Sequence, residues 1–329
     1  MKSILKKVAG LALTAVLALG MFGCSSGSSD DPIMPPVSGK QTVATPEFSV
    51  ESGAVDSGTS VTITCSTEGA KIYYTTDGSN PTASSTEYAD AISVTAAVTL
   101  KAIAVKDGMN DSAVASASYT IYTPKYSVGD FVLKDKTILS KDTELTDTQK
   151  SNVAAVIVRA DTSKKPALGV GIVHNRSGLA WCTSSAKGLS KEITTLQGDK
   201  TSGYTDGSDG WEILKEACSD AESNPENYPA WNYSLTYAET NGLAGNLATG
   251  WYLPTVAELD TIYQNKDTVD ASLLKAGGSQ FGTSCYWSCC QGPSSSNYAR
   301  VLNFTNGVMY GYGGKSSNSG YVCSVRAFN

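Results

Sequence analysis

The last fifty residues of the chain contain neither aspartate nor glutamate. Between Gln280 and Asn329 the only charged residues are Arg300, Lys315 and Arg326. Calcium in proteins is held by several oxygen ligands, which usually include carboxylates. The absence of acids therefore disfavours a calcium-bridged sugar site in the C-terminal region.

Histidine is almost absent as well. His174 is the only histidine, and it lies at the edge of an apolar segment, where a structural role is expected. A serine nucleophile needs a base beside it, and Cys285, Cys289 and Cys290 lack the Cys-x-x-Cys spacing of zinc sites. We therefore expect no catalytic residues, no metal and no cofactor, so the chain is predicted not to be an enzyme.

Charge is also scarce. Charged residues make up 17% of the chain and the net charge is −6. Apart from three lysines near the N-terminus, no basic cluster occurs in the sequence. Binding to nucleic acid depends on neutralising its phosphates, so nucleic acid is not expected as a partner.

Cysteines are more frequent than histidine, and an odd number of them follows Cys24. Of eight cysteines, seven follow Cys24, so at least one thiol stays unpaired unless it bonds another chain. Cys182 and Cys218 are the best-separated candidates for a disulfide in an exported protein. Cys65 is expected to act as a buried small hydrophobic residue.

The N-terminus has the composition of an export signal. Three lysines precede an apolar run over residues 8–22, which is short for a membrane span. The run ends at Gly23-Cys24, and this resembles a bacterial lipoprotein signal. The resemblance implies a signal peptide over residues 1–23 and a lipidated Cys24. It also implies an exported, surface-exposed protein anchored in the outer membrane. Ordinary secretion, with cleavage nearby, is the alternative.

Two regions follow the signal. Residues 24–45 have the composition of a flexible linker. Residues 46–122 contain short segments of alternating polar and apolar residues with frequent turn signals, which predict an all-β immunoglobulin-like sandwich. The sequence IYYTTDGSNPT, followed by STEY and TLKAIAV, resembles the chitobiase/β-hexosaminidase C-terminal module. That resemblance implies a spacer or accessory module without an active site.

Residues 126–329 have a different character, with helical segments, long loops and all five tryptophans. Asp209 is predicted to cap a helix that runs to Cys218. The pattern Thr255-x-x-Glu258 is a capping box, so a second helix is expected to begin there. The pair Asn306-Gly307 predicts a hairpin with a type I′ turn.

The C-terminal region uses few residue types. From Met309 to Tyr321, eleven of thirteen residues are Tyr, Gly, Ser or Asn, the types enriched in antibody paratopes. Changing only the adenines of an Asn codon reaches Tyr, Ser, Gly and Cys, so a surface randomised at adenines would have this composition. A low-complexity tail is the alternative, but the segment ends in aromatic and β-branched residues.

Five motifs together suggest a family. The chain is similar to the C-type-lectin-like domains of the formylglycine-generating-enzyme type, and most similar to lipoprotein variable proteins of diversity-generating retroelements. The resemblance implies an α+β C-type-lectin-like domain over residues 126–329, in which exposed positions vary between about 286 and 323. The motifs are AWC (180–182), GWYLPTVAEL (250–259), YWS (286–288), NFTNG (303–307) and VRAF (325–328).

Strand periodicity places the expected binding face. If Leu302 points into the core, alternation directs Val301 and Asn303 outward and keeps Tyr298 and Arg300 nearer the core or its rim. The predicted ligand-binding residues are Cys289, Cys290, Tyr298, Arg300, Val301, Asn303, Met309, Tyr310, Tyr312, Ser316, Ser317, Asn318, Ser319 and Tyr321.

The predicted function is that of a surface-displayed lipoprotein that binds a ligand through a diversified face. The partner is an unidentified protein or glycan on another cell or surface, and the membrane is contacted only through the lipid anchor. Two alternatives stay open. One is a non-variable glycan-binding adhesin. The other, less favoured, is a cysteine-dependent oxidase of the formylglycine-generating type, whose Asn-Val-Trp-Glu-Trp type motif is missing here.

Overall fold

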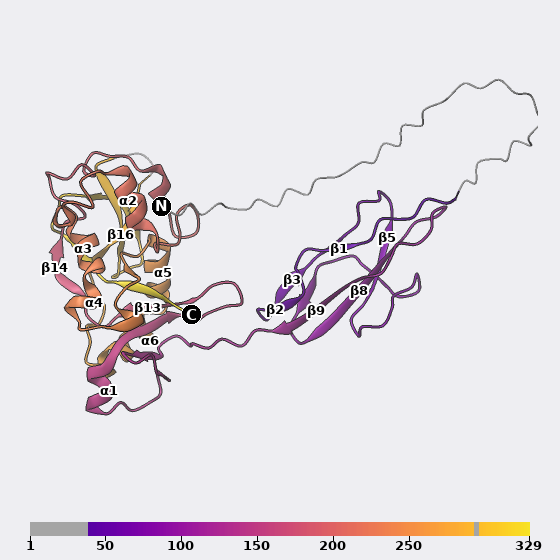
Figure 1. Ribbon diagram of the computed structural model, residues 1–329, viewed down its shortest axis with the longest axis horizontal. Helices are drawn as coiled ribbons and strands as arrows, with labels where there is room; N and C mark the ends of the chain where they lie inside the picture. The colour runs from indigo at the N-terminus through magenta and orange to yellow at the C-terminus, as the bar shows by residue number, and fades with distance from the viewer. Residues whose placement is uncertain (1–38, 293–295) are drawn as a thin grey trace, which may run out of the picture. The chain divides into compact units, whose positions relative to one another are not determined.

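The computed structural model of the protein describes residues 39–292 and 296–329 (Figure 1). The predicted signal peptide, Cys24 and most of the predicted linker lie outside the described residues. Within the described part, no helix is both long enough and apolar enough to cross a membrane. The structure is rich in sheet, and its strands form separate sheets in residues 47–121 and 131–328.

Residues 47–121, all of which are described, contain strands and no helix. Five strands form one sheet in the order β2-β9-β8-β5-β6, and two short pairs, β1 with β4 and β3 with β7, complete the unit. Along β8 every second residue from Leu100 to Ala104 is buried, as alternation in the sequence predicts. Val61 and Tyr119 share the same small core. The strands are β1 (Glu47–Phe48), β2 (Gly53–Val55), β3 (Thr59–Val61), β4 (Ile63–Thr64), β5 (Lys71–Thr75), β6 (Thr86–Glu87), β7 (Ile92–Val94), β8 (Val98–Val105) and β9 (Ala115–Ile121).

The first sheet of residues 131–328 has six strands, in the order β11-β10-β12-β13-β20-β15. All its pairings are antiparallel. Its central strand β12 reads Val-Ala-Ala-Val-Ile-Val-Arg and is buried until its last residue, because both faces of the sheet are covered. The strands are β10 (Phe131–Leu133), β11 (Ile138–Leu139), β12 (Val153–Arg159), β13 (Ala167–Gly171), β15 (Trp251–Tyr252) and β20 (Val325–Phe328).

The second sheet has five strands, in the order β14-β19-β16-β17-β18. β16 pairs with β17 in antiparallel register and with β19 in parallel register. The register shifts between Trp287 and Gln291 on β16, and between Ala299 and Val301 on β17. The strands are β14 (Asn175–Leu179), β16 (Cys285–Gln291), β17 (Tyr298–Asn303), β18 (Met309–Gly314) and β19 (Gly320–Val322).

Short helices accompany these sheets. The capping box at Thr255 is confirmed: its hydroxyl accepts from the Glu258 amide at 3.1 Å, and the Glu258 carboxylate accepts from the Thr255 amide at 2.8 Å. Asp209 stands at the start of α2 but makes no capping bond, because its carboxylate accepts from the Tyr204 hydroxyl at 2.6 Å. The helices are α1 (Asp147–Asn152), η1 (Thr194–Leu196), α2 (Gly210–Ala217), η2 (Pro225–Asn227), α3 (Pro229–Leu235), α4 (Tyr237–Thr240), η3 (Gly245–Leu247), α5 (Val256–Gln264) and α6 (Lys266–Lys275).

Two fully buried tryptophans connect the second sheet to its surroundings. The Trp181 indole donates to the Ser288 carbonyl at 2.9 Å, and the Trp287 indole donates to the Leu179 carbonyl at 2.7 Å. A Cβ added at Gly313 or Gly320 would lie 2.5 or 2.2 Å from the Trp287 ring system. Glycine at these two positions is therefore required by the packing of Trp287.

Candidate recognition face

The C-terminal hairpin forms where the sequence predicts it, but with a different turn. β17 and β18 pair in antiparallel register, and the Gly307 amide donates to the Asn303 carbonyl at 2.8 Å. Gly307 has a φ of +69°, whereas Asn306 is not among the described residues with positive φ. A type I′ turn needs positive φ at both central residues, so that assignment was wrong and the connection is a longer loop.

We use the term recognition face for the exposed or half-exposed residues of this region. Tyr298 and Val308 are 41% and 43% exposed, which is unusual for large apolar side chains in this structure. The loop after β18 is exposed from Ser316 to Ser319. The half-exposed members are Arg300, Asn303, Met309, Tyr310 and Tyr321.

Several predicted site residues lie elsewhere. Cys289 and Cys290 are fully buried, so the prediction that they border this face was wrong. Val301, predicted to point outward, is only 6% exposed, whereas Tyr298, predicted nearer the core, is exposed. The register shift between Ala299 and Val301 accounts for Tyr298, because a bulge breaks the alternation of inward and outward side chains. Val301 and Leu302 are consecutive and both buried, and β16 is buried from Tyr286 to Gln291, so both faces of these strand segments are covered. Tyr312 belongs to β18, and its side chain is outside the described part.

The half-exposed members are held by the core beneath them. The Tyr321 ring packs edge-on against buried Tyr286, with 5.6 Å between the ring centroids. The Arg300 guanidinium donates to the Gln291 carbonyl at 3.4 Å and to the Met309 sulfur at 3.0 Å. The face therefore presents ordered side chains.

The loop over residues 316–319 is also ordered. The Ser317 amide donates to the Gly314 carbonyl at 2.9 Å, and the hydroxyls of Ser317 and Ser319 are 3.0 Å apart. Gly178 in β14 has a φ of +81°, and a Cβ there would lie 2.4 Å from the Asn318 carbonyl oxygen. β14 thus approaches the back of this loop closely, while the serine and asparagine side chains stay accessible.

Lys315 is a structural residue that the composition did not reveal. It is fully buried, and its ammonium donates to the carbonyls of Gly188 and Lys191 at 2.8 and 3.1 Å. The same ammonium lies 4.8 Å from the centre of the Trp181 ring, a cation–π contact. Burial lowers the pKa of Lys315 to about 8. Lys315 fastens β18 to a loop more than a hundred residues earlier in the chain.

The cysteines do not form the predicted disulfide. All seven cysteines after Cys24 are free thiols, and both Cys182 and Cys218 are buried. Burial raises the pKa of Cys182 to about 12 and also raises that of Cys323. Cys65, predicted to be buried, is half-buried and donates to the Ala44 carbonyl at 3.2 Å.

His174 is buried among aromatic side chains. Its Nε2 lies 3.1 Å from the Gly171 carbonyl oxygen, and its ring packs at 4.3 Å on Phe281. Burial lowers the pKa of His174 to about 3, so the ring is neutral over the physiological range. Among the residues that the structure describes, no group of three or more His, Cys, Asp or Glu side chains could hold a metal ion.

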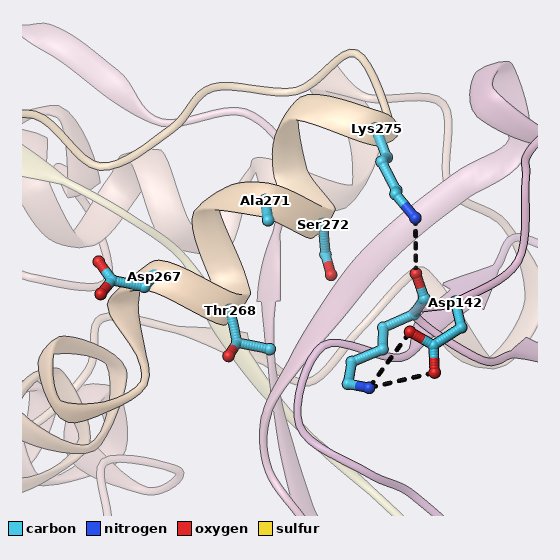
Figure 2. Close-up of a pocket in the computed structure, with 7 residues that line it drawn as sticks. Asp142, Asp267, Thr268, Ala271, Ser272 and Lys275 are labelled. Atoms are coloured by element: carbon cyan, nitrogen blue, oxygen red, sulfur yellow. Dashed lines mark hydrogen bonds and ion pairs between the residues drawn. The ribbon is translucent and has the colours of Figure 1, made fainter.

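The cavities of the C-terminal region are not lined by the predicted binding residues, although one of them is lined by Phe304 and Thr305 of the hairpin loop. A cavity of about 380 Å³ beside α6 is shown in Figure 2. Its lysines are engaged: the Lys275 ammonium donates to the Lys141 carbonyl at 3.1 Å, and Lys141 pairs with Asp142 at 3.2 Å (Figure 2). None of the predicted binding residues lines this cavity or the four others described.

Two regions of the chain match known families. Residues 171–326 match the Lcl C-terminal domain. Residues 50–116 match the chitobiase/beta-hexosaminidase C-terminal domain. The second match confirms the resemblance to the chitobiase/β-hexosaminidase module that the motif predicts. The stretch that matches the Lcl C-terminal domain contains the whole recognition face.

The curated proteins and the solved structures give no further family for the chain. No curated protein matches the chain. Among solved structures, a fimbrial protein from Bacteroides ovatus is 11% identical and aligns over 87% of this chain and 70% of its own length, with a TM-score of 0.48.

Proposed function

We propose that the protein is a surface-displayed lipoprotein that binds a ligand through a diversified face of a C-type-lectin-like domain. The observation that carries this proposal is the separation of roles within the Lcl C-terminal domain. Tyr298 and the Ser316–Ser319 loop are exposed, whereas Trp287, Gly320 and Lys315 are buried in the scaffold.

The chemistry of the face suits recognition of a macromolecule. Tyrosines supply large amphipathic contact areas, and serine and asparagine supply adaptable hydrogen bonds. Tyr298, Tyr310 and Tyr321 are the aromatic anchors. Met309 directly precedes Tyr310, and Asn318 lies three residues before Tyr321. Because these residues line none of the described cavities, we propose a protein or a glycan chain on another cell or surface as the ligand.

An enzymatic role has less support. The thiols that invite comparison with formylglycine-generating enzymes include Cys289, Cys290 and Cys323, which are fully buried. A reactive cysteine needs an accessible thiolate. Burial raises the pKa of Cys289 and Cys323, and although a hydrogen bond from Cys289 lowers the pKa of Cys290, that thiol is fully buried as well. We therefore propose a binding protein that uses no metal or cofactor.

Location is a separate part of the proposal. Export, lipidation of Cys24 and anchoring in the outer membrane would hold the folded domains outside the cell. Metabolic labelling with a palmitate analogue tests this step. We expect the wild-type protein to be labelled and Cys24→Ala to be released unlabelled; labelled Cys24→Ala would contradict it.

Diversification is tested at the level of DNA. We expect a near-identical template repeat beside a reverse-transcriptase gene, differing from codons 286–323 mainly at adenines. The codons for Trp287, Gly313 and Gly320 should agree in the two copies, because these positions are required by packing. Differences spread over all four bases, or the lack of a repeat, would favour the alternative of a non-variable adhesin.

Binding is tested with the mature protein. We expect the Tyr298→Ala, Tyr310→Ala variant to lose most of its binding to cells that carry the partner. A Val114→Ala variant, which alters an exposed apolar side chain of the preceding module, is the matched control. Equal binding by both variants would refute the assignment of the face.

A further inference from the structure

A second candidate site lies away from the recognition face, in a cavity of about 360 Å³. Its lining includes Arg159 at the end of β12, Lys164 and Lys165 in the loop before β13, and polar residues of the 205–208 loop. The volume falls within the range of small-molecule sites, roughly 300–1,000 Å³. None of the predicted recognition residues contributes to it.

The cations of this cavity are not neutralised. Within the described residues, Arg159, Lys164 and Lys165 form no ion pair, unlike Lys141 in Figure 2. The Arg159 Nη2 donates to the Pro166 carbonyl at 3.3 Å, but its Nε is buried without a hydrogen-bond partner. A buried donor without a partner is unfavourable, so the guanidinium is not fully satisfied by the protein. Because Nε has practically no accessible surface, a ligand in the cavity would contact the terminal nitrogens of Arg159.

One of the carboxylates in the cavity is already committed to the scaffold. Glu258 is buried, and its oxygens accept from the Tyr252 hydroxyl at 2.7 Å and from the Thr255 amide at 2.8 Å. Burial raises the pKa of its carboxyl group. The other carboxylate, Asp206, is exposed, and one of its oxygens accepts from the Ser208 amide at 3.0 Å. Three cations therefore face a single exposed acid.

We propose that this cavity binds a carboxylated sugar of monosaccharide size. A guanidinium matches the geometry of a carboxylate and can bind it through two parallel hydrogen bonds, so Arg159 would hold the acid group with Lys165 beside it. Asp206, Thr205 and Ser208 would bind the hydroxyls of the sugar ring. A phosphate ion suits the site less well, because it carries more charge beside Asp206 and supplies fewer hydroxyl donors.

Calorimetric titration of the mature protein tests the assignment with three probes: sodium D-galacturonate, neutral D-galactose and inorganic phosphate. We expect galacturonate to bind at least about tenfold more tightly than galactose, which differs only in the carboxylate, since charged hydrogen bonds carry the recognition. Arg159→Met should weaken galacturonate binding about tenfold or more. Lys165→Gln should weaken it by about two- to fivefold.

Two controls separate this site from the recognition face. Arg176→Met removes an exposed arginine outside the cavity, and the Tyr298→Ala, Tyr310→Ala variant alters only the face; both should bind galacturonate as the wild type does. Failure of galacturonate to bind, equal affinity for galactose, tighter binding of phosphate, or loss of binding in either control would overturn the proposal. Circular dichroism shows whether Arg159→Met folds. If it does not fold, the variant of exposed Lys165 decides the test, and unchanged galacturonate binding by Lys165→Gln refutes the proposal.

Discussion

The two sheets of residues 131–328 are specified by different kinds of sequence. In the first, β12 is apolar along almost its whole length and buried on both faces. In the second, β18 reads Met-Tyr-Gly-Tyr-Gly-Gly, and the packing depends on Trp287 lying against Gly313 and Gly320. The central strand of the second sheet, β16, is buried like β12, but β18 contributes three glycines and packs on one large side chain. Such a strand depends on one buried contact while several of its own residues stay half-exposed.

The largest expected effect is that of Trp287→Ala. Removing a fully buried tryptophan should lower the free energy of unfolding by about 3–5 kcal/mol, and it also removes the bond to the Leu179 carbonyl. Urea unfolding followed by circular dichroism measures the loss. A loss below about 1 kcal/mol, similar to that of a surface substitution, would show that the second sheet does not depend on this residue.

Gly320→Ala should cause the second-largest loss in the free energy of unfolding. Its new Cβ would lie 2.2 Å from the Trp287 indole nitrogen, so the packing must shift, and overpacking of this kind costs about 1–3 kcal/mol. Gly311→Ala is the matched control, because a Cβ there meets no atom within 4 Å. Equal unfolding free energies for the two variants would contradict the role given to Trp287.

Lys315 gives a smaller, pH-dependent effect. Its folded pKa of about 8 lies below the usual 10.5, so between these values the unfolded chain binds a proton that the folded protein does not. Stability contributed by this group therefore rises from about pH 8 to pH 10.5 and is lowest below pH 8. The difference in melting temperature between the wild type and Lys315→Met should change with pH across this window. A constant difference would mean that the Lys315 ammonium keeps its proton.

Exposed positions of the recognition face should matter least for folding. Tyr298→Ser and Asn318→Ser are expected to change the free energy of unfolding by less than about 0.5 kcal/mol, as surface substitutions usually do. Thermal unfolding checks both variants. A loss above about 1 kcal/mol would show that these side chains stabilise the fold. It would then weaken the distinction between exposed residues of the recognition face and buried scaffold residues such as Trp287.

Local signals in the sequence predicted local features well. The capping box at Thr255 and the hairpin before Met309 depend on neighbouring residues, and both occur in the structure. The orientation of Tyr298 was mispredicted because the bulge in β17 is fixed by pairing between strands. The burial of Cys289 was mispredicted because side chains on both faces of β16 are covered, which depends on distant parts of the chain. Lys315 was also missed, since its partners Gly188 and Lys191 lie far away in the sequence. The preceding β unit was easier to predict because its residues alternate regularly and its family motif is local.

The position of Trp287 has a consequence for the thermodynamics of association. Its indole joins β16 to the end of β14, while Gly313 and Gly320 bring β18 and β19 against its ring. A face supported in this way has little conformational freedom left to lose when a partner binds, and ordering of side chains and loops is a major opposing contribution to affinity. Variants with different side chains on the same support should therefore begin from a similarly small entropic penalty, so their affinities should differ mainly through the contacts they make.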